Sequence, residues 1–519
     1  MNYKNQYQRK AHQEIDFIFL TLLPQAGLSV REEQVKLSHQ MLDTLLEGKI
    51  ALCDAGVGIG KTYAYLVACI LMRKYAAAIG NRWLCDKRPI VISTSSIALQ
   101  EAIIQEYIPF LSDIFLTTGL IASPLKAIVR KGKEHFVCDN RLEVRLEAVR
   151  EKPKNEAQKK ALFSLKQIYD MDEVANLSSF DRRLVCVPKF CPKECPGRTS
   201  CRYQMYLKQA RDPDIFFQIC NHNYLLADSS HRAKDYKPLL TDYRALIVDE
   251  AHKLPDAARQ MYGKSLCYED ILEICDFLEG KHQGMTAKKL KGVFHNMFHV
   301  ISENHMTKAG PASAFRMTEE CAIVLEDGKE ALKELTVKLR GIAPGWIRNQ
   351  LEKAGEVLTI FTESSKHYIL HLEQDKGKLP QLCATSRKIP DILSGMLWSQ
   401  GFPAILTSGT LKAGNGFSRT RQENGLGKEI RVMEYVAESP FAYEKNCLLY
   451  LPQTLRRTKH GSRHAGTAYP AADLFDLRSY AGAVHLVFFN GQRLPDLTGQ
   501  PAFSHGGSVA QCPGGDHAV

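Results

Sequence analysis

The stretch Ile50 to Thr62 reads I-A-L-C-D-A-G-V-G-I-G-K-T and decides the fold class. A short apolar run ending at Asp54 predicts a strand, and the Tyr/Ala/Leu run after Thr62 predicts a helix. Between them lies a glycine-rich loop, whose backbone can turn its N–H groups inward onto a phosphate. The helix N-terminus adds a favourable potential for the same anion. Strand, loop and helix in this order predict an α/β fold that binds a nucleotide.

The residue types of this loop fit ATP. Lys61 is expected to reach the β and γ phosphates, and Thr62 to hold Mg²⁺. The remaining phosphate contacts are expected from Ala55, Gly56, Gly58 and Gly60. Ala55 departs from the G-x-x-x-x-G-K-[ST] pattern, because a glycine is usual there. The alternative is a surface glycine turn that merely precedes a lysine.

Composition describes a globular protein of several domains. The chain has 519 residues, of which 45% are hydrophobic and 24% are charged. The formal net charge of +11 favours a polyanionic partner such as nucleic acid, and would also suit an acidic membrane surface. Met1 to Glu14 lacks the apolar core of a secretory signal, and no apolar run approaches membrane-spanning length. We therefore expect a cytoplasmic protein without a membrane partner, in which the 15 cysteines are not a disulfide framework.

A helix upstream of the loop, between Gln25 and Leu46, carries Gln34. The side-chain amide of a glutamine offers one donor and one acceptor, which match the adenine edge. Gln34 is therefore a candidate base contact. The alternative is an exposed glutamine on an amphipathic helix.

Two hydroxyl residues, Thr94 and Ser95, follow the β-branched run Pro89 to Ser93, and a helix is expected to begin near Ala98. Hydroxyls and backbone amides at the junction of a strand and a helix can hold a phosphodiester. Thr94 and Ser95 are therefore candidate DNA contacts, although such hydroxyls are also ordinary helix caps.

Two adjacent carboxylates, Asp249 and Glu250, end the apolar run of R-A-L-I-V-D-E-A-H, Arg244 to His252. At the C-terminal edge of a parallel sheet, Asp249 would lie near the Mg²⁺ held by Thr62. Glu250 would then orient or deprotonate the attacking water. Together with the phosphate loop, this pair predicts an ATPase.

The order of these motifs resembles that of superfamily-two DEAH-box helicases. The phosphate loop, V-I-S-T-S-S, V-D-E-A-H and L-T-S-G-T-L at Leu406 to Leu411 look like motifs I, Ia, II and III. Two further matches are similar to the DinG branch, which is related to XPD: K-G-K-E-H-F-V-C at Lys131 to Cys138 and I-C-N-H-N-Y-L-L-A-D at Ile219 to Asp228. The resemblance runs from about Arg31 to about Pro452.

The resemblance adds three residues to the expected site. It implies that His252 completes the catalytic set with Lys61, Asp249 and Glu250. It also implies that Ser408 and Thr410 couple the nucleotide state to the grip on DNA. S-G-T is otherwise a common turn.

A cysteine group lies between the two DinG-like matches. Cys138 stands alone, and V-C-V-P-K-F-C-P-K-E-C-P-G-R-T-S-C then contains Cys186, Cys191, Cys195 and Cys201. The group lacks the paired C-x₂-C knuckles usual in a zinc ribbon, and its spacing suits a cubane iron–sulfur cluster. Zinc and unliganded cysteines are the alternatives. By resemblance, a [4Fe–4S] cluster would be held by Cys138, Cys191, Cys195 and Cys201, with Cys186 spare or exchanging with Cys191.

Basic residues flank these cysteines. They are Lys131, Lys133, Lys189, Lys193, Arg198 and Arg202. Such residues would line a positive surface suited to single-stranded DNA, or they are simply solvated charges.

The resemblance predicts the domain order. The first motor domain would comprise 1–134, 221–255 and 395–436, interrupted by an iron–sulfur insert at 135–220 and a helical arch at 256–394. A second motor domain would begin at 437–472, and 473–519 would be an aberrant, disordered tail. The expected fold is thus a RecA-like parallel sheet flanked by helices, with a cysteine-rich insert, an α-helical insert and an incomplete second RecA-like domain.

The last part of the chain departs from the family. It has no Q-x-x-G-R-x-x-R segment, the family's motif VI, and its last lysine is Lys459 and its last glutamate Glu444. We expect a shifted reading frame near Ala472 to Ala483. The alternative is a divergent strand, Ala483 to Phe489, before a disordered tail.

The function implied by resemblance is an ATP-dependent DNA helicase that moves 5′-to-3′ on single-stranded DNA in repair or replication. Its cofactors would be ATP, Mg²⁺ and the [4Fe–4S] cluster. Two lobes normally close on the nucleotide, so a nucleotide- and DNA-binding remnant without unwinding activity is the second hypothesis. A zinc-stabilised ATPase switch that acts on protein partners is the third.

Overall fold

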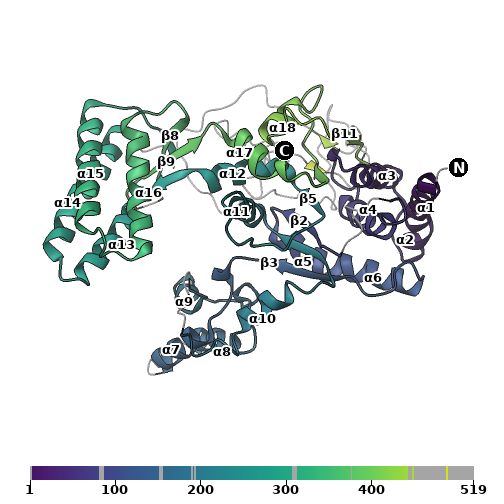
Figure 1. Ribbon diagram of the computed structural model, residues 1–519, viewed down its shortest axis with the longest axis horizontal. Coiled ribbons are helices and arrows are strands. Elements are labelled where there is room, and N and C mark those ends of the chain that lie inside the picture. The colour runs from purple at the N-terminus through teal and green to yellow at the C-terminus, as the bar shows by residue number, and fades with distance from the viewer. Residues whose placement is uncertain are drawn as a thin grey trace, which may run out of the picture.

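The computed structural model describes residues 3–80, 87–150, 156–188, 191, 194–306, 312–375 and 377–441, and the short strands 447–448 and 487–488. A central α/β body carries two inserts (Figure 1). One is a small helical lobe at the bottom of the view, and the other is an elongated helical bundle at the left.

The body is built on a seven-stranded sheet with the order β11-β1-β10-β5-β2-β4-β3, in which every neighbouring pair is parallel. Its strands are β1 (Ile50–Ala55), β2 (Ile90–Thr94), β3 (Lys126–Arg130), β4 (Ile215–Cys220), β5 (Ala245–Asp249), β10 (Ala404–Ser408) and β11 (Val432–Ala437). The inner strands β2, β5 and β10 are buried at every position, as a sheet covered on both faces requires. The predicted α/β fold with a parallel sheet is confirmed.

Alternate residues of the strands enter two separate cores. Ala51 and Cys53 of β1 pack into one core and Ile50 and Leu52 into the other. Helices that contribute to the first core are α1 (Tyr3–Phe17), α2 (Leu23–Gln25), α3 (Glu32–Leu46), α4 (Lys61–Tyr75) and α6 (Ile108–Thr117). Those of the second are α11 (His222–Ala233), α12 (Leu254–Tyr262) and α17 (Ile389–Met396). The sheet is therefore covered by helices on both faces.

Short helical segments complete the body. They are the π-helices η1 (Ile18–Leu22) and η2 (Ile103–Tyr107), the 3₁₀ turns η5 (Ala251–Lys253) and η6 (Trp398–Gln400), α5 (Ile97–Ala102) and α18 (Ser418–Glu423).

The cysteine-rich insert leaves the sheet after β3 and returns at β4. It contains η3 (Lys133–His135), α7 (Asp139–Arg150), α8 (Glu156–Ser164), η4 (Met171–Glu173), α9 (Ser179–Val185) and α10 (Arg202–Gln209). A small core of its own, including Leu142, Leu162 and Met171, supports these helices. The range predicted for this insert, 135–220, includes β4, which the structure places in the central sheet. The insert proper is therefore residues 131–214.

The second insert is a helical bundle joined to the body by a small sheet. Its elements are β6 (Lys264–Leu266), α13 (Tyr268–Glu279), α14 (Gly284–His305), β7 (Ala312–Ala314), α15 (Glu319–Lys338), α16 (Gly345–Thr362), β8 (Tyr368–Glu373) and β9 (Gln381–Ser386). The strands form an antiparallel sheet with the order β6-β9-β8-β7. The expectation of helices alone missed this sheet, because strands as short as A-S-A at β7 carry no readable alternation.

The predictions for the C-terminal part concern residues that lie mostly outside the described part of the chain. Within it, β12 (Cys447–Leu448) pairs antiparallel with β13 (Val487–Phe488). The predicted start of a second motor domain at 437–472 and the predicted tail at 473–519 otherwise fall beyond Phe441, where the description stops. In the part of the chain that the structure describes, no helix has the length and apolarity needed to cross a bilayer.

Two histidines join α1 to α3 through a polar chain. The Nε2 atom of His12 lies 2.8 Å from Asp43, its Nδ1 lies 2.6 Å from Nδ1 of His39, and Nε2 of His39 lies 2.9 Å from Asp16. The hydrogen bond to Asp43 raises the pKa of His12. Burial acts to raise the pKa of Asp43, but hydrogen bonds from His12 and Gln8 outweigh it and lower that pKa.

We expect the replacement His12→Gln to destabilise the protein at about pH 6 by up to about 1 kcal/mol, the usual scale for a partly exposed pair. The folded-state pKa of His12 lies above its ordinary value of 6.5, so this stabilisation is complete below 6.5 and is lost as the pH rises through the folded-state pKa. Denaturant unfolding from pH 5 to pH 9 measures this loss. His295→Gln, on the exposed side of α14, is the control. A His12→Gln deficit that does not shrink toward high pH would contradict the expectation.

Candidate active site

The predicted catalytic residues meet at the carboxyl edge of the central sheet. β10 lies between β1 and β5, and its register pairs Ser408 with Asp54 of β1 and Thr407 with Asp249 of β5. The phosphate loop follows β1, and Glu250 follows β5. The structure therefore brings motifs I, II and III to one place, where ligands of open α/β sheets usually bind.

The phosphate loop requires glycine at two positions. Gly58 and Gly60 both have φ of 85°, in the left-handed region. A Cβ at Gly60 would lie 2.1 Å from Nε2 of Gln34, which donates a hydrogen bond to the Gly60 carbonyl at 2.7 Å. Ala55 is the last residue of β1 and is buried, so the usual first glycine is replaced where the backbone is a regular strand. The buried Gln34 thus anchors the loop to α3.

A polar network connects Lys61 to the other motifs. The Lys61 Nζ lies 3.5 Å from Oε1 of Glu250, and the Ser408 hydroxyl donates to Oε2 of Glu250 at 3.2 Å. The Nδ1 atom of His252 lies 2.7 Å from the Ser408 Oγ and 3.3 Å from Glu250. The hydrogen bond to His252 lowers the pKa of Glu250 to about 2. Glu250 is therefore a fixed carboxylate at neutral pH.

Glu250 also has an unusual backbone conformation. Its φ is 53°, which non-glycine residues rarely adopt, and it stands where β5 turns into η5. Such strain often occurs at functional sites, where the surrounding structure holds it in place. Here the turn points the Glu250 carboxylate toward Lys61 and Ser408.

Asp249 is the buried member of the acidic pair. One carboxylate oxygen accepts the Glu250 N–H at 3.0 Å, and the other accepts the Tyr65 hydroxyl at 3.4 Å. Burial raises the pKa of Asp249 to about 6. A nearby cation would favour its ionised form. Thr62 lies in the first turn of α4 with a partly exposed side chain, so a hydroxyl and a carboxylate are available as Mg²⁺ ligands.

The DNA-facing candidates differ in exposure. Thr94 is fully buried, and its hydroxyl accepts the Ser96 N–H at 3.4 Å, while Ser95 is partly exposed. Ser96, the next hydroxyl residue, accepts the Leu99 N–H at the start of α5 and so acts as a helix cap, which was the alternative for these hydroxyls. Of the two predicted contacts, only Ser95 therefore presents a hydroxyl at the surface.

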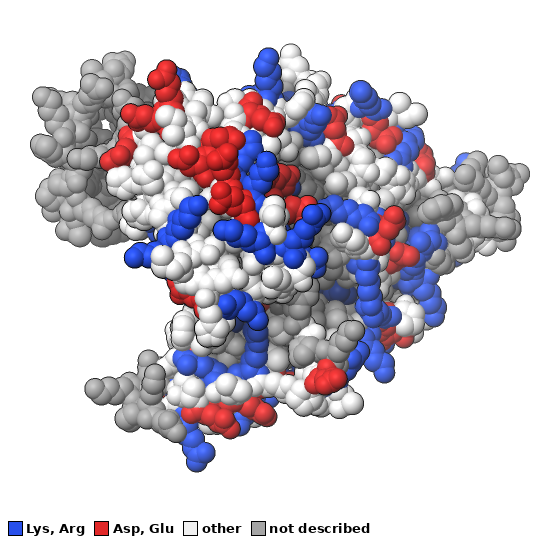
Figure 2. Space-filling model, turned by 60° about the vertical axis from the view of Figure 1, so that its left-hand side comes forward, with Lys and Arg blue, Asp and Glu red and all other residues white. Residues whose placement is uncertain are grey.

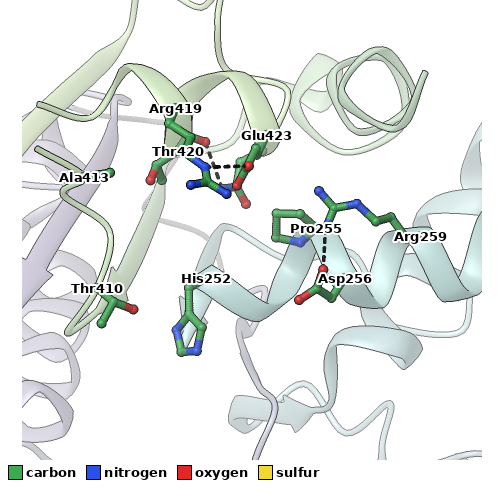
Figure 3. A pocket seen from close by; sticks show the side chains of 10 residues that line it. His252, Pro255, Asp256, Arg259, Thr410, Ala413, Arg419, Thr420 and Glu423 are labelled. Carbon is green, nitrogen blue, oxygen red and sulfur yellow. Dashed lines mark hydrogen bonds and ion pairs between the residues drawn. The ribbon is translucent and has the colours of Figure 1, made fainter. Parts of the chain in front are cut away.

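Thr410 is exposed and lines a polar cavity of about 320 Å³ beside His252 (Figure 3). The helices α12 and α18 form its other walls, where Arg259 pairs with Asp256 and Arg419 pairs with Glu423. This cavity therefore borders His252 of motif II and Thr410 of motif III.

Two contacts of the site had no signal in the sequence patterns. The Asp54 carboxylate accepts the N–H groups of Leu411 at 2.7 Å and Lys412 at 3.3 Å, which ties the motif III loop to β1. Ser439 donates to the Val57 carbonyl at 3.2 Å, and a Cβ at Gly58 would lie 2.4 Å from the Phe441 ring. Residues 438–441 therefore lie against the phosphate loop. Both contacts join segments more than 350 residues apart, which motif spacing does not reveal.

Three other insert cysteines act on the pKa of Cys191. Burial raises the pKa of Cys191, and the thiols of Cys138, Cys195 and Cys201 raise it further. The Sγ of Cys186 donates to the Arg183 carbonyl at 3.4 Å instead. The neighbourhood of Cys191 thus contains the other three predicted ligands.

Some of the basic residues that were expected to form a positive surface are paired with carboxylates of the insert. Lys131 bonds to Asp170 at 2.7 Å and Asp172 at 3.1 Å, and Arg202 pairs with Asp139. Lys189 and Lys193 lie outside the described residues. Figure 2 nevertheless shows Lys and Arg side chains across the middle of the view and along the recess above the lower lobe.

Comparison with known proteins finds distant relatives that include ATP-dependent helicases. No family model matches the chain. It is 22% identical over 459 residues to the ATP-dependent DNA helicase YoaA of Haemophilus influenzae, covering 83% of this chain and 67% of the relative. It is 22% identical over 509 residues to the ATP-dependent helicase DinG of Mycobacterium tuberculosis, covering 90% of this chain and 72% of the relative. The chain thus spans about two thirds of their length. The solved structure of Xpd4 from S. tokodaii matches with a TM-score of 0.38 and 14% identity, over 78% of this chain and 60% of that one.

Proposed function

We propose that this chain, a relative of the DinG and YoaA ATP-dependent helicases, binds ATP with Mg²⁺ and uses ATP hydrolysis to move along single-stranded DNA. The observation that carries the proposal is the network of Lys61, Glu250, Ser408 and His252 beside the phosphate loop. This network joins three helicase-like motifs at the sheet edge where a nucleotide would bind.

Each residue of the network would act on a different part of the reaction. Lys61 would neutralise charge on the β and γ phosphates, and Thr62 and Asp249 would hold Mg²⁺. A water molecule would attack the γ phosphorus, and the bond from that phosphorus to the bridging oxygen of ADP would break. Because Glu250 has a pKa of about 2, it is better suited to orienting this water than to removing its proton before attack.

Ser408 and His252 would link hydrolysis to DNA. Both contact Glu250, and His252 also lines the cavity that contains the exposed Thr410. If DNA binding moved Thr410, the motif III loop would therefore transmit that movement to the Glu250 carboxylate. Gln34 would have two roles: its hydrogen bond to the Gly60 carbonyl would hold the phosphate loop in place, and it would also contact adenine.

Single-stranded DNA would lie along the recess between the body and the cysteine-rich lobe, where Figure 2 shows basic side chains. We assign residues 131–214 to a cluster lobe and, because α12 and α17 pack in the core of the body, only residues 264–386 of the expected 256–394 to a helical arch. Both would be inserted in one motor domain. The 5′-to-3′ direction is inferred from the family resemblance alone. Unwinding of a fluorescent duplex with a 5′ overhang, but not of one with a 3′ overhang, would support it.

The cysteine lobe would hold a [4Fe–4S] cluster. The donor set fits, because four thiols without disulfides share one neighbourhood and the fifth is bonded elsewhere. When bound, the cluster would fasten the loop from Cys191 to Cys201 onto the start of α7. Cys138, Cys191, Cys195 and Cys201 would be its ligands.

The anaerobically purified wild-type protein should carry about four iron atoms per chain and absorb at about 400 nm. We expect Cys195→Ser to lose both the iron and this absorbance. Cys186→Ser is the matched control and keeps both, because its thiol bonds to the Arg183 carbonyl. Iron analysis and absorption spectra measure the effect. Loss of iron from Cys186→Ser with retention in Cys195→Ser would overturn the ligand assignment, and a colourless wild-type protein with bound zinc would favour the zinc-stabilised switch.

A further inference from the structure

A group of metal-ligating side chains lies on the small sheet that joins the helical bundle to the body (Figure 1). The register of β8 and β9 places His371 directly opposite Cys383, and Glu373 follows His371 by two residues on the same face. The intervening Leu372 and its partner Leu382 point to the other face and pack in the bundle core. The three polar side chains are therefore segregated from that core.

The geometry of these three side chains approaches that of a metal site. Their ligand atoms all lie within 4.8 Å of one another, and His371 Nε2 is 3.3 Å from Glu373 Oε1. A tetrahedral zinc ion with ordinary bond lengths would hold its ligand atoms about 3.3 to 3.8 Å apart. Only a small closure of the group is therefore needed.

The ring nitrogen of His371 that faces the group is Nε2, which lies 3.3 Å from Oε1 of Glu373. An ion held by both residues would therefore take the Nε2 lone pair. The Nδ1 atom, which is buried and has no hydrogen-bond partner among the described residues, would carry the ring proton.

We propose that His371, Glu373 and Cys383 form a divalent-metal site of the zinc class, separate from the cysteine lobe. A thiol, an imidazole and a carboxylate are the donor types that zinc accepts, and the exposed Ser265 opposite Cys383 leaves a fourth position open to water. Binding would release the Cys383 thiol proton to solvent and form a metal–sulfur bond. The ion would cross-link β8 and β9 at the base of the arch. β9 contacts α12, the helix that follows Asp249 to His252 in the chain.

Titration of the reduced full-length chain with Co²⁺ tests the proposal. We expect the wild-type chain to bind one equivalent more than Cys383→Ser and His371→Ala, and to show a thiolate-to-cobalt absorption that both variants lose and that Zn²⁺ displaces. Cys275→Ala, a buried cysteine of the same bundle, is the matched control and keeps the extra equivalent. The cysteine lobe contributes equally in all four proteins.

The variants also distinguish the site from a folding defect. When each protein is compared with its own metal-free form, Zn²⁺ should raise the melting temperature of only the wild type and Cys275→Ala. Equal Co²⁺ uptake and equal spectra in wild type, Cys383→Ser and His371→Ala would overturn the proposal. So would a loss in Cys383→Ser that His371→Ala does not share.

Discussion

Lys61→Ala is expected to lower kcat/KM for ATP by about 10² to 10³, the effect of removing one preorganised charge from a phosphoryl-transfer site. Lys61 is the cation that the structure places between the phosphate loop and Glu250, at 3.5 Å from that carboxylate. Its removal would leave the charge on the transferring phosphoryl group without this partner. Steady-state phosphate release measures the loss.

Lys49→Ala is the matched control for this variant. Lys49 precedes β1 at the opposite end of the strand from the phosphate loop and pairs with Glu47 at 2.7 Å. We expect its ATP turnover to equal that of the wild type. Equal turnover in Lys61→Ala and Lys49→Ala would show that the loop does not bind the reacting phosphates.

Glu250→Gln is expected to separate binding from hydrolysis. The variant should bind ATP at least as well as the wild type, because it loses a negative charge close to the phosphates, while turnover falls by about 10² to 10⁴. The amide retains the size of the carboxylate but loses the charge that would orient the water and that Ser408 and His252 contact. A fluorescent ATP analogue measures binding, and phosphate release measures turnover.

Glu47→Gln is the control, since it removes a carboxylate of the same type away from the sheet edge. Turnover of Glu250→Gln within a few-fold of this control would contradict the role of Glu250 at the attacking water. Loss of ATP binding and hydrolysis together would instead mean that Glu250 builds the pocket rather than acting on water.

Local sequence patterns predicted several strands of the central sheet well. The apolar runs before Asp54 and Asp249, and the glycine-rich loop between strand and helix, are signals within one short window of sequence. The structure contains β1, β2 and β5 within one or two residues of the expected strands. Buried parallel strands are nearly continuous apolar runs, so their positions can be predicted without any knowledge of tertiary contacts.

Contacts between distant segments could not be predicted in the same way. The bond between His252 and Ser408 joins residues 156 positions apart, and it depends on the register of β10 beside β5. The assignment of β4 to the central sheet depends likewise on its pairing with β2 and β3. The His371 and Cys383 pair arises from a short antiparallel ladder inside a region whose periodicity indicated helices only.

The measurement that tests the proposed motor most directly is ATP hydrolysis by the purified 519-residue chain, with and without single-stranded DNA, beside Lys61→Ala. We predict Mg²⁺-dependent turnover that rises when single-stranded DNA is added and that Lys61→Ala lowers by about 10² to 10³. Wild-type turnover no greater than that of Lys61→Ala, with nucleotide and DNA still bound, would contradict the motor and favour a binding module without unwinding activity.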